Sequence, residues 1–192
     1  MDKAKLIVKY LISLITQPEQ TWIYLANQDV DEAKPQYMQT NYYLPLLGFM
    51  SLFIFVVTGM DGVGSFSLQK GMTSMVPATV AYFVAPYLAM FIIRELLTSC
   101  IFKMSNPDHD RLQLYVFYST SYLMLVEMAA AMMPSFAFIR LAAYYLIYIT
   151  WTGSHTMIRV EEHRRWMFGF VAFMVINFSP SIIIGVLKFM QH

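Results

Sequence analysis

Long apolar stretches recur along this chain, and short polar segments separate them. The five that stand out are residues 42–60, 71–93, 112–133, 135–153 and 166–187. Each is long enough to cross about 30 Å of hydrocarbon at about 1.5 Å per helical residue. The third contains one charged residue, Glu127, and the fourth contains one, Arg140. The pattern predicts an all-α polytopic membrane protein with five transmembrane helices.

The first 41 residues follow a shorter, amphipathic pattern. On a helical wheel Lys5, Lys9 and Ser13 lie on one stripe, opposite Ile7 and Leu11. Such spacing is typical of a helix that lies in the membrane interface and does not cross it. The chain therefore divides into cytoplasmic or interfacial amphipathic helices, residues 1–41, and a transmembrane bundle, residues 42–192.

A second interfacial helix is predicted after Thr16. The run Thr16-Gln17-Pro18-Glu19 matches a capping box with proline in the first turn, and Trp22 follows one turn later. One interpretation seats this helix on the membrane, with the Trp22 ring half buried among headgroups and its N–H in water. The other makes Pro18, Glu19 and Trp22 a docking surface for a cytosolic partner.

The distribution of lysine and arginine predicts the orientation. Ten of the 13 fall on the side of the N-terminus, and three (Lys70, Arg140 and Lys188) fall on the other. Because positive residues accumulate in cytoplasmic loops, we expect a cytoplasmic N-terminus. Five spans then place the C-terminus outside.

Composition narrows the function classes. The chain is 58% hydrophobic and 13% charged, whereas soluble domains carry about 25% charged residues. A net charge of +1 offers no field for nucleic acid. A single cysteine, Cys100, excludes an intrachain disulfide. The His-Glu-x-x-His pattern of zinc proteases is absent from the sequence, and we expect no enzymatic activity.

Glu127 and Arg140 are the charged residues predicted inside the membrane. Counted from the outer ends of their spans, they lie at similar depth. We predict an intramembrane ion pair, Glu127–Arg140, that holds the third and fourth spans together. The alternative is a proton or ion site of a transporter that uses Glu127.

Two polar segments on the cytoplasmic side, residues 107–111 and 155–165, contain histidines and carboxylates. Such side chains from adjacent loops could hold a divalent metal, although their spacing matches no established site. We therefore expect no cofactor and keep a metal site as the alternative. Its candidate ligands are Asp108, His109, Asp110, His155, Glu162 and His163.

The order of several short motifs resembles the YIP family, the Ypt/Rab-interacting integral membrane proteins, in its short prokaryotic form. The quoted runs are "LITQPEQTW", "YYLPLLG", "DRLQLYVFYSTSYLMLVEMAAAMMP" and "LIYITWTG". They cover nearly the whole chain in family order. One departure lies after Thr120, where the family usually has proline and this chain has Ser121-Tyr122.

The resemblance implies a five-span fold and a non-enzymatic role. Eukaryotic members act in vesicle trafficking through small GTPases. For this chain a small GTPase partner is expected by family analogy alone. For a prokaryotic member we expect a cell (inner) membrane protein that acts as a scaffold, adaptor or membrane-organising factor. Its partners would be the lipid bilayer and other membrane proteins or copies of itself. The alternative is a small oligomeric transporter or channel using Glu127. The direction in which Glu127 faces distinguishes the two, since a wet cavity favours transport.

Overall fold

The computed structural model describes residues 3–27, 31–60, 65–99, 102, 107–133 and 136–190. Within these ranges every regular element is a helix, and a single β-bridge joins Met60 to Phe66. The helices, with η marking 3-10 or π winding, are α1 (Lys3–Thr16), α2 (Pro18–Ala26), η1 (Asp31–Ala33), α3 (Pro35–Met38), η2 (Gln39–Tyr43), α4 (Leu44–Gly59), α5 (Leu68–Thr98), α6 (His109–Met132), η3 (Ala137–Tyr145), α7 (Leu146–Thr156), η4 (Glu162–Arg164) and α8 (Arg165–Phe189).

Four of the described helices are long and apolar enough to span a membrane. They are Pro35–Gly59, Leu68–Thr98, His109–Met132 and Glu162–Phe189. The all-helical membrane prediction is confirmed to this extent. The remaining predicted span, residues 135–153, corresponds to η3 and α7, which is not among the four. Arg140 and the hydroxyl-bearing Thr150 and Thr152 lower its apolarity.

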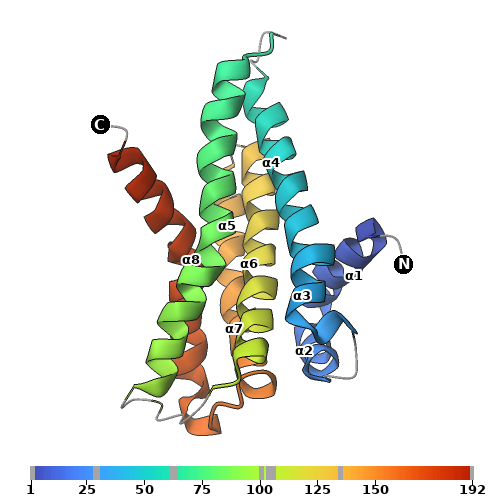
Figure 1. Cartoon of the computed structure of the whole chain (residues 1–192), viewed down its shortest axis with the longest axis vertical. Helices are drawn as coiled ribbons and strands as arrows, with labels where there is room; N and C mark the ends of the chain where they lie inside the picture. The colour runs from blue at the N-terminus through green and yellow to red at the C-terminus, as the bar shows by residue number, and fades with distance from the viewer. Residues whose placement is uncertain are drawn as a thin grey trace.

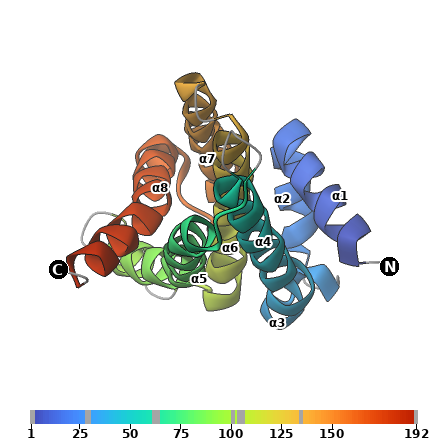
Figure 2. The same ribbon diagram turned by 90° about the horizontal axis from the view of Figure 1, so that it is seen from above.

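The long helices form a bundle around α6. Successive helices α4, α5, α6, α7 and α8 alternate in direction, and α1 and α2 pack at one end of the bundle, on the flank opposite α8 (Figures 1 and 2). α6 is the most buried of the four membrane-length helices, with 72% of its most apolar window inside the protein. It therefore supplies the core against which the neighbouring helices pack.

Prolines act differently in the two long outer helices. α5 continues through Pro77 and Pro86, and α8 continues through Pro180. A helix-interior proline removes a backbone hydrogen bond and favours a bend. α8 changes direction midway, and its C-terminal half leaves the bundle (Figure 1). Pro45 follows the π turn η2 inside the continuous helix Pro35–Gly59, where its missing N–H also removes a backbone hydrogen bond.

Tyrosine hydroxyls join the helices at several levels. A buried hydroxyl must find an acceptor where water is excluded, and the backbone carbonyls of neighbouring helices supply one. Tyr42 in the π turn η2 instead contacts the Ser121 hydroxyl of α6 at 2.8 Å. The tyrosines that donate to carbonyls are Tyr43 to Tyr82 (2.6 Å), Tyr115 to Thr150 (2.9 Å), Tyr122 to Ala142 (2.6 Å) and Tyr145 to Ile15 (2.8 Å).

The junction of α1 and α2 differs from the predicted capping box. The Thr16 hydroxyl donates to the Ile12 carbonyl, and Gln17 occupies the N-cap position without a side-chain hydrogen bond. The Gln17 amide still bonds to the Ser13 carbonyl, but the Gln17 backbone (φ −142°, ψ 62°) leaves the helical region and separates α1 from α2. Pro18 begins α2 as predicted. Because Thr16 turns back to its own helix, its side chain does not cap the next one.

Trp22 also lies differently from the interfacial expectation. Its side chain is fully buried, and its indole N–H donates to the Ile149 carbonyl of α7 at 3.1 Å. The ring lies 5.6 Å from that of Tyr115, centroid to centroid. The expectation of a half-buried ring with a wet N–H was therefore wrong. Gly153 explains the burial, because it has no side chain and lets the indole approach the α7 backbone.

Candidate functional site

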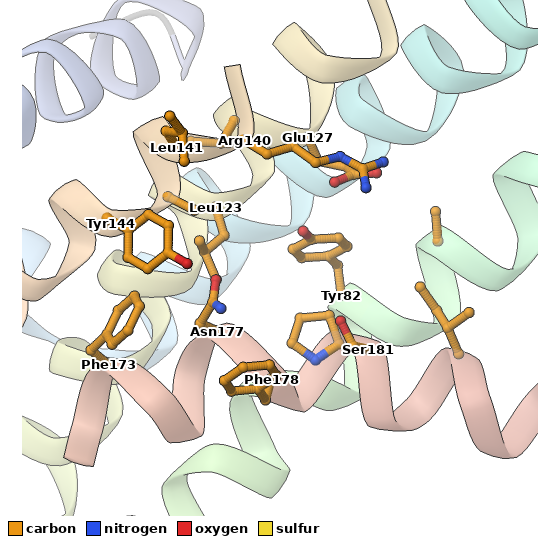
Figure 3. Close-up of a pocket in the computed structure, with 15 residues that line it drawn as sticks. Tyr82, Leu123, Glu127, Arg140, Leu141, Tyr144, Phe173, Asn177, Phe178 and Ser181 are labelled. Carbon is orange, nitrogen blue, oxygen red and sulfur yellow. The ribbon is translucent and has the colours of Figure 1, made fainter. Parts of the chain in front are cut away.

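A cavity of about 470 Å³ lies between α5, α6, η3 and α8 (Figure 3). Its volume falls within the roughly 300–1,000 Å³ typical of ligand pockets. Most of its wall is aliphatic or aromatic. Its polar lining residues are Tyr82, Glu127, Arg140, Tyr144, Asn177 and Ser181. The cavity thus combines an apolar wall with a few polar groups, as small-molecule sites do.

The bend in α8 and the winding of η3 account for the cavity. Pro180 is itself a lining residue, and α8 leaves the bundle in this region (Figure 1). On the facing wall the nine residues of η3 adopt 3-10 winding, a length that is uncommon. Tyr122 of α6 secures this segment through its bond to the Ala142 carbonyl. Both walls are therefore irregular where the cavity opens.

Glu127 and Arg140 lie at the same end of this cavity (Figure 3). Glu127 is half-buried and Arg140 is exposed. Neither side chain forms an ion pair with another residue in the described part of the chain. The helices bring the two residues to one site, but the predicted pair is not among the ion pairs of the described residues. A charged side chain within a membrane is costly unless a group of opposite charge accompanies it.

Tyr82 connects the charged end of the cavity to α4. Its side chain is buried, and its hydroxyl points toward Glu127 (Figure 3). Its backbone carbonyl accepts the hydrogen bond from the Tyr43 hydroxyl, which fixes this turn of α5 against α4. A hydroxyl held beside a carboxylate can donate to that carboxylate or to a bound molecule.

Four of the polar lining residues were not predicted as site residues from the sequence. Asn177 carried a usable signal, because it is the one amide side chain in the otherwise apolar stretch 166–187. Ser181 and the tyrosines Tyr82 and Tyr144 carried none, since serines and tyrosines are frequent throughout this chain. The bend in α8 and the winding of η3 decide which of them reach the cavity.

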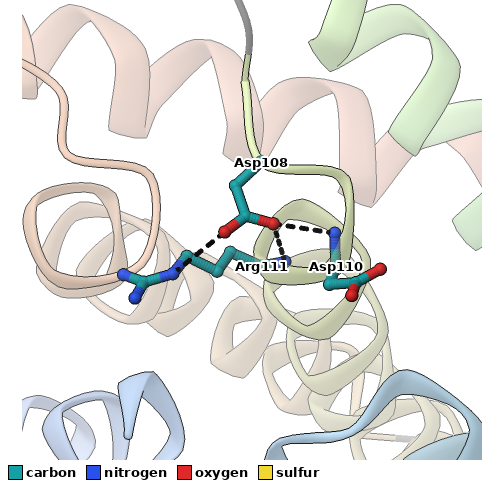
Figure 4. Close-up of polar contacts among 3 residues, drawn as sticks. All are labelled: Asp108, Asp110 and Arg111. Atoms are coloured by element: carbon teal, nitrogen blue, oxygen red, sulfur yellow. Dashed lines mark hydrogen bonds and ion pairs between the residues drawn. The ribbon is translucent and has the colours of Figure 1, made fainter. Parts of the chain in front are cut away.

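Asp108, proposed as a metal ligand, instead begins α6. Its carboxylate accepts hydrogen bonds from the amides of Asp110 (3.1 Å) and Arg111 (3.3 Å), and it pairs with the Arg111 Nε at 3.2 Å (Figure 4). This is an N-cap, in which a side-chain oxygen satisfies amides of the first turn. Both carboxylate oxygens are therefore engaged within α6.

The other candidate ligands do not meet in one site. His163 lies 3.6 Å from the Glu161 carboxylate and accepts a hydrogen bond from the Arg164 Nε at 3.0 Å. His155 and Glu162 are exposed. Among the described residues no group of three or more histidines, cysteines or carboxylates could hold a metal ion. The candidate ligands are thus not brought together among these residues, and we do not propose a metal site.

At the other end of α8, Arg165 holds a pair of tryptophans. Its guanidinium lies 4.3 Å from the centre of the Trp151 ring, and its Nε donates to the Trp151 carbonyl at 3.1 Å. Trp151 stacks on Trp166 with ring centroids 5.1 Å apart. Aromatic rings beside arginine are typical of the membrane–water interface.

The arrangement of the cavity is suited to binding a molecule. It offers one carboxylate, one guanidinium, hydroxyls and an amide in an otherwise apolar space. A comparison of the chain with protein-family models, with curated proteins and with solved structures finds no match.

Proposed function

We propose that the chain is a non-enzymatic integral membrane protein that acts by binding a ligand in the cavity between α5, α6, η3 and α8. One observation carries this proposal: Glu127 and Arg140 both line the cavity without an ion pair between them. Ionisable residues within membrane spans are expensive and mark substrate or ion sites. Two opposite charges that face one cavity without pairing favour a ligand-binding site over a structural ion pair between the helices.

The proposal includes a fifth span formed by η3 and α7. Nine residues of 3-10 helix at about 2.0 Å and eleven of α-helix at about 1.5 Å extend roughly 34 Å. This length matches about 30 Å of hydrocarbon. The alternating direction of α4 to α8 also supports five crossings (Figure 1). The surplus of positive residues on one side favours a cytoplasmic N-terminus and an outer C-terminus.

A cavity-filling variant tests the proposal. Ser181 lines the cavity, and the next residue, Ile182, is 53% exposed and does not line it. Wild-type protein, Ser181→Trp and Ile182→Trp would be purified from native membranes, and their bound molecules compared by native mass spectrometry. We expect Ser181→Trp to lose a bound species that wild type and Ile182→Trp retain. Equal retention by both variants would contradict ligand binding in the cavity.

Transport is one form of this proposal, in which Glu127 serves a moving ion or solute. Proteoliposomes with a pH-sensitive dye inside would report proton entry, and Glu127→Gln is the informative variant because it keeps the size of the side chain. Flux through wild type that Glu127→Gln abolishes would support a transporter. If wild-type proteoliposomes are no more permeable to protons than empty ones, the protein binds its ligand without transporting protons.

The second candidate is a scaffold or adaptor, as the resemblance to the YIP family implies. It is supported by exposed apolar side chains on α1 and α2, which include Val8 (53%), Ile12 (55%) and Ile23 (58%). A photo-crosslinking residue at Ile12, with Leu14 as the buried control, would test it in native membranes. Crosslinks from Ile12 to one membrane protein or to a second copy would support an adaptor. Crosslinks to lipid alone would contradict it.

A further inference from the structure

We infer that the cavity binds a zwitterionic amphiphile whose ammonium lies at Glu127 and whose phosphate lies at Arg140. This inference rests on the proposed function and names the chemistry of the ligand. Glu127 and Arg140 lie at one end of the cavity, and aromatic rings of α8 line another part of it (Figure 3).

The charges of the cavity favour a zwitterion. Glu127 and Arg140 are its two lining residues of opposite charge, and neither has an ion-pair partner among the described residues. A ligand with a single charge would neutralise one and leave the other exposed in a low-dielectric space. A molecule with one cation and one anion neutralises both.

Side-chain geometry assigns the two ends of the ligand. The planar guanidinium of Arg140 presents parallel donors that match a phosphate. The carboxylate of Glu127 accepts hydrogen bonds from an ammonium, and the Tyr82 hydroxyl beside it supplies another acceptor (Figure 3). A primary ammonium, with three donors, suits this pair of acceptors.

The remaining wall suits an apolar portion of the same molecule. Phe173 and Phe178 of α8 lie across the cavity from Glu127 and Arg140 (Figure 3). Phe178 is 48% exposed, and Leu141 on the facing η3 wall is 61% exposed (Figure 3). An acyl chain could therefore leave the cavity between η3 and α8 beside these exposed apolar side chains.

The depth of the charged end is compatible with a lipid headgroup. Glu127 lies five residues before the end of α6 at Met132, or about 8 Å along the helix. A lipid of the outer leaflet would therefore sink its headgroup by about one and a half helical turns. A soluble molecule with the same ammonium and phosphate could reach the same groups, so the test separates the two sources.

The test measures the thermal unfolding of the full chain in detergent with three probes. They are phosphatidylethanolamine, phosphatidylglycerol, which lacks the ammonium, and water-soluble glycerophosphoethanolamine. We expect phosphatidylethanolamine to raise the Tm more than phosphatidylglycerol does. The reason is that its ammonium adds one charge-assisted contact, which corresponds to about tenfold tighter binding. If glycerophosphoethanolamine raises the Tm as much as phosphatidylethanolamine does, the ligand is a free solute. If it raises the Tm much less, the ligand is a membrane lipid. Equal responses to the two lipids would overturn the inference.

Charge variants assign the contacts. Glu127→Gln should abolish the preference for phosphatidylethanolamine. Arg140→Gln should lower the affinity for both lipids about tenfold, because one charge-assisted contact is lost. Arg94→Gln and Glu95→Gln are the matched controls, because these exposed residues lie near the opposite end of α5 and do not line the cavity. If Glu127→Gln kept the preference, the zwitterion assignment would be wrong.

A measurement on wild-type protein tests the inference even if the variants fail to fold. Native mass spectrometry of wild type would compare the lipids that co-purify with those of the surrounding membrane. Enrichment of ammonium phospholipids supports the inference, and a bound lipid population that matches the membrane overturns it. The proposed function fails separately, when Ser181→Trp and Ile182→Trp retain the same bound molecules.

Discussion

The indole N–H of Trp22 donates to the Ile149 carbonyl at 3.1 Å, across 127 positions of sequence. This bond joins α2, which precedes the bundle, to α7, near its other end in sequence. Gly153 lies one turn further along α7 and allows the indole to pack against the backbone. The N-terminal segment that contains α2 is therefore part of the folded bundle.

Gly153→Ala should loosen this contact. An added Cβ would lie 2.8 Å from ring carbons of both Trp22 and Tyr115, which are fully buried and cannot yield easily. We expect a loss of about 1–3 kcal/mol in the free energy of unfolding, the usual cost of overpacking. Thermal unfolding in detergent measures it. Gly48→Ala is the control, since its Cβ would meet no atom within 4 Å; equal effects at both positions would contradict the prediction.

Substitutions at Trp22 separate its packing from its hydrogen bond. Trp22→Ala removes a fully buried side chain and should cost about 3–5 kcal/mol. Trp22→Phe keeps much of the ring but leaves the Ile149 carbonyl without this donor, so it should cost less. Limited proteolysis of the N-terminal segment, run beside thermal unfolding, should show faster cleavage for Trp22→Ala. Unchanged protection would mean that the bilayer, and not α7, holds the segment.

A hydroxyl pair links α4 to α5. The Thr79 hydroxyl donates to Ser51 Oγ at 2.7 Å, and each hydroxyl is also close to a carbonyl of its own helix. Thr79→Val keeps the shape and should cost about 0.6–2 kcal/mol, the range for interhelical bonds in membranes. Thr73→Val is the matched control, because Thr73 bonds to carbonyls of its own helix. A cost at Thr73 as large as that at Thr79 would argue against the interhelical contribution.

Cysteine labelling tests whether η3 and α7 cross the membrane. In a Cys100→Ser background, single cysteines would replace Asp110, in the first turn of α6, and Glu162, after α7. Because two crossings separate these positions in a five-span protein, an impermeant thiol reagent should label both from the same side. We expect that side to be cytoplasmic. Labelling from opposite sides would show that the segment 137–156 does not cross.

Asp108 provides a test of cap against metal ligand. Asp108→Ala should destabilise α6 by about 0.5–2 kcal/mol, because the amides of Asp110 and Arg111 lose their acceptor. Asp108→Asn keeps a good N-cap residue and should retain most of the stability. Thermal unfolding with and without chelator measures both. A chelator-sensitive wild type that Asp108→Asn makes insensitive would restore the metal interpretation.

Much of the fold could be predicted from apolar runs alone. The structure has membrane-length helices over four of the five predicted stretches, because a run of about twenty apolar residues permits few structures other than a helix in a membrane. The fourth stretch was harder, since Arg140 interrupts it and its first half winds as 3-10 helix. Winding of this kind depends on contacts such as the Tyr122 bond to Ala142, which no local pattern reveals.

The candidate site was predictable only at its charged end. Glu127 and Arg140 stand out in sequence because charge inside an apolar run is rare. Their placement at one cavity follows from helix length and depth, but the space between them does not. That space depends on the bend midway along α8 (Figure 1) and on which face of α8 turns inward.

The sequence by itself determined the helical class, most of the membrane-length segments and the two charged residues within apolar stretches, because these depend on composition and spacing along one chain. Tertiary structure alone decided that Trp22 is buried against α7, that Asp108 caps α6, and that Glu127 and Arg140 face a shared cavity. Each of these depends on which groups from distant parts of the chain come within a few ångströms. Pairing of that kind is set by helix packing, which local periodicity does not encode.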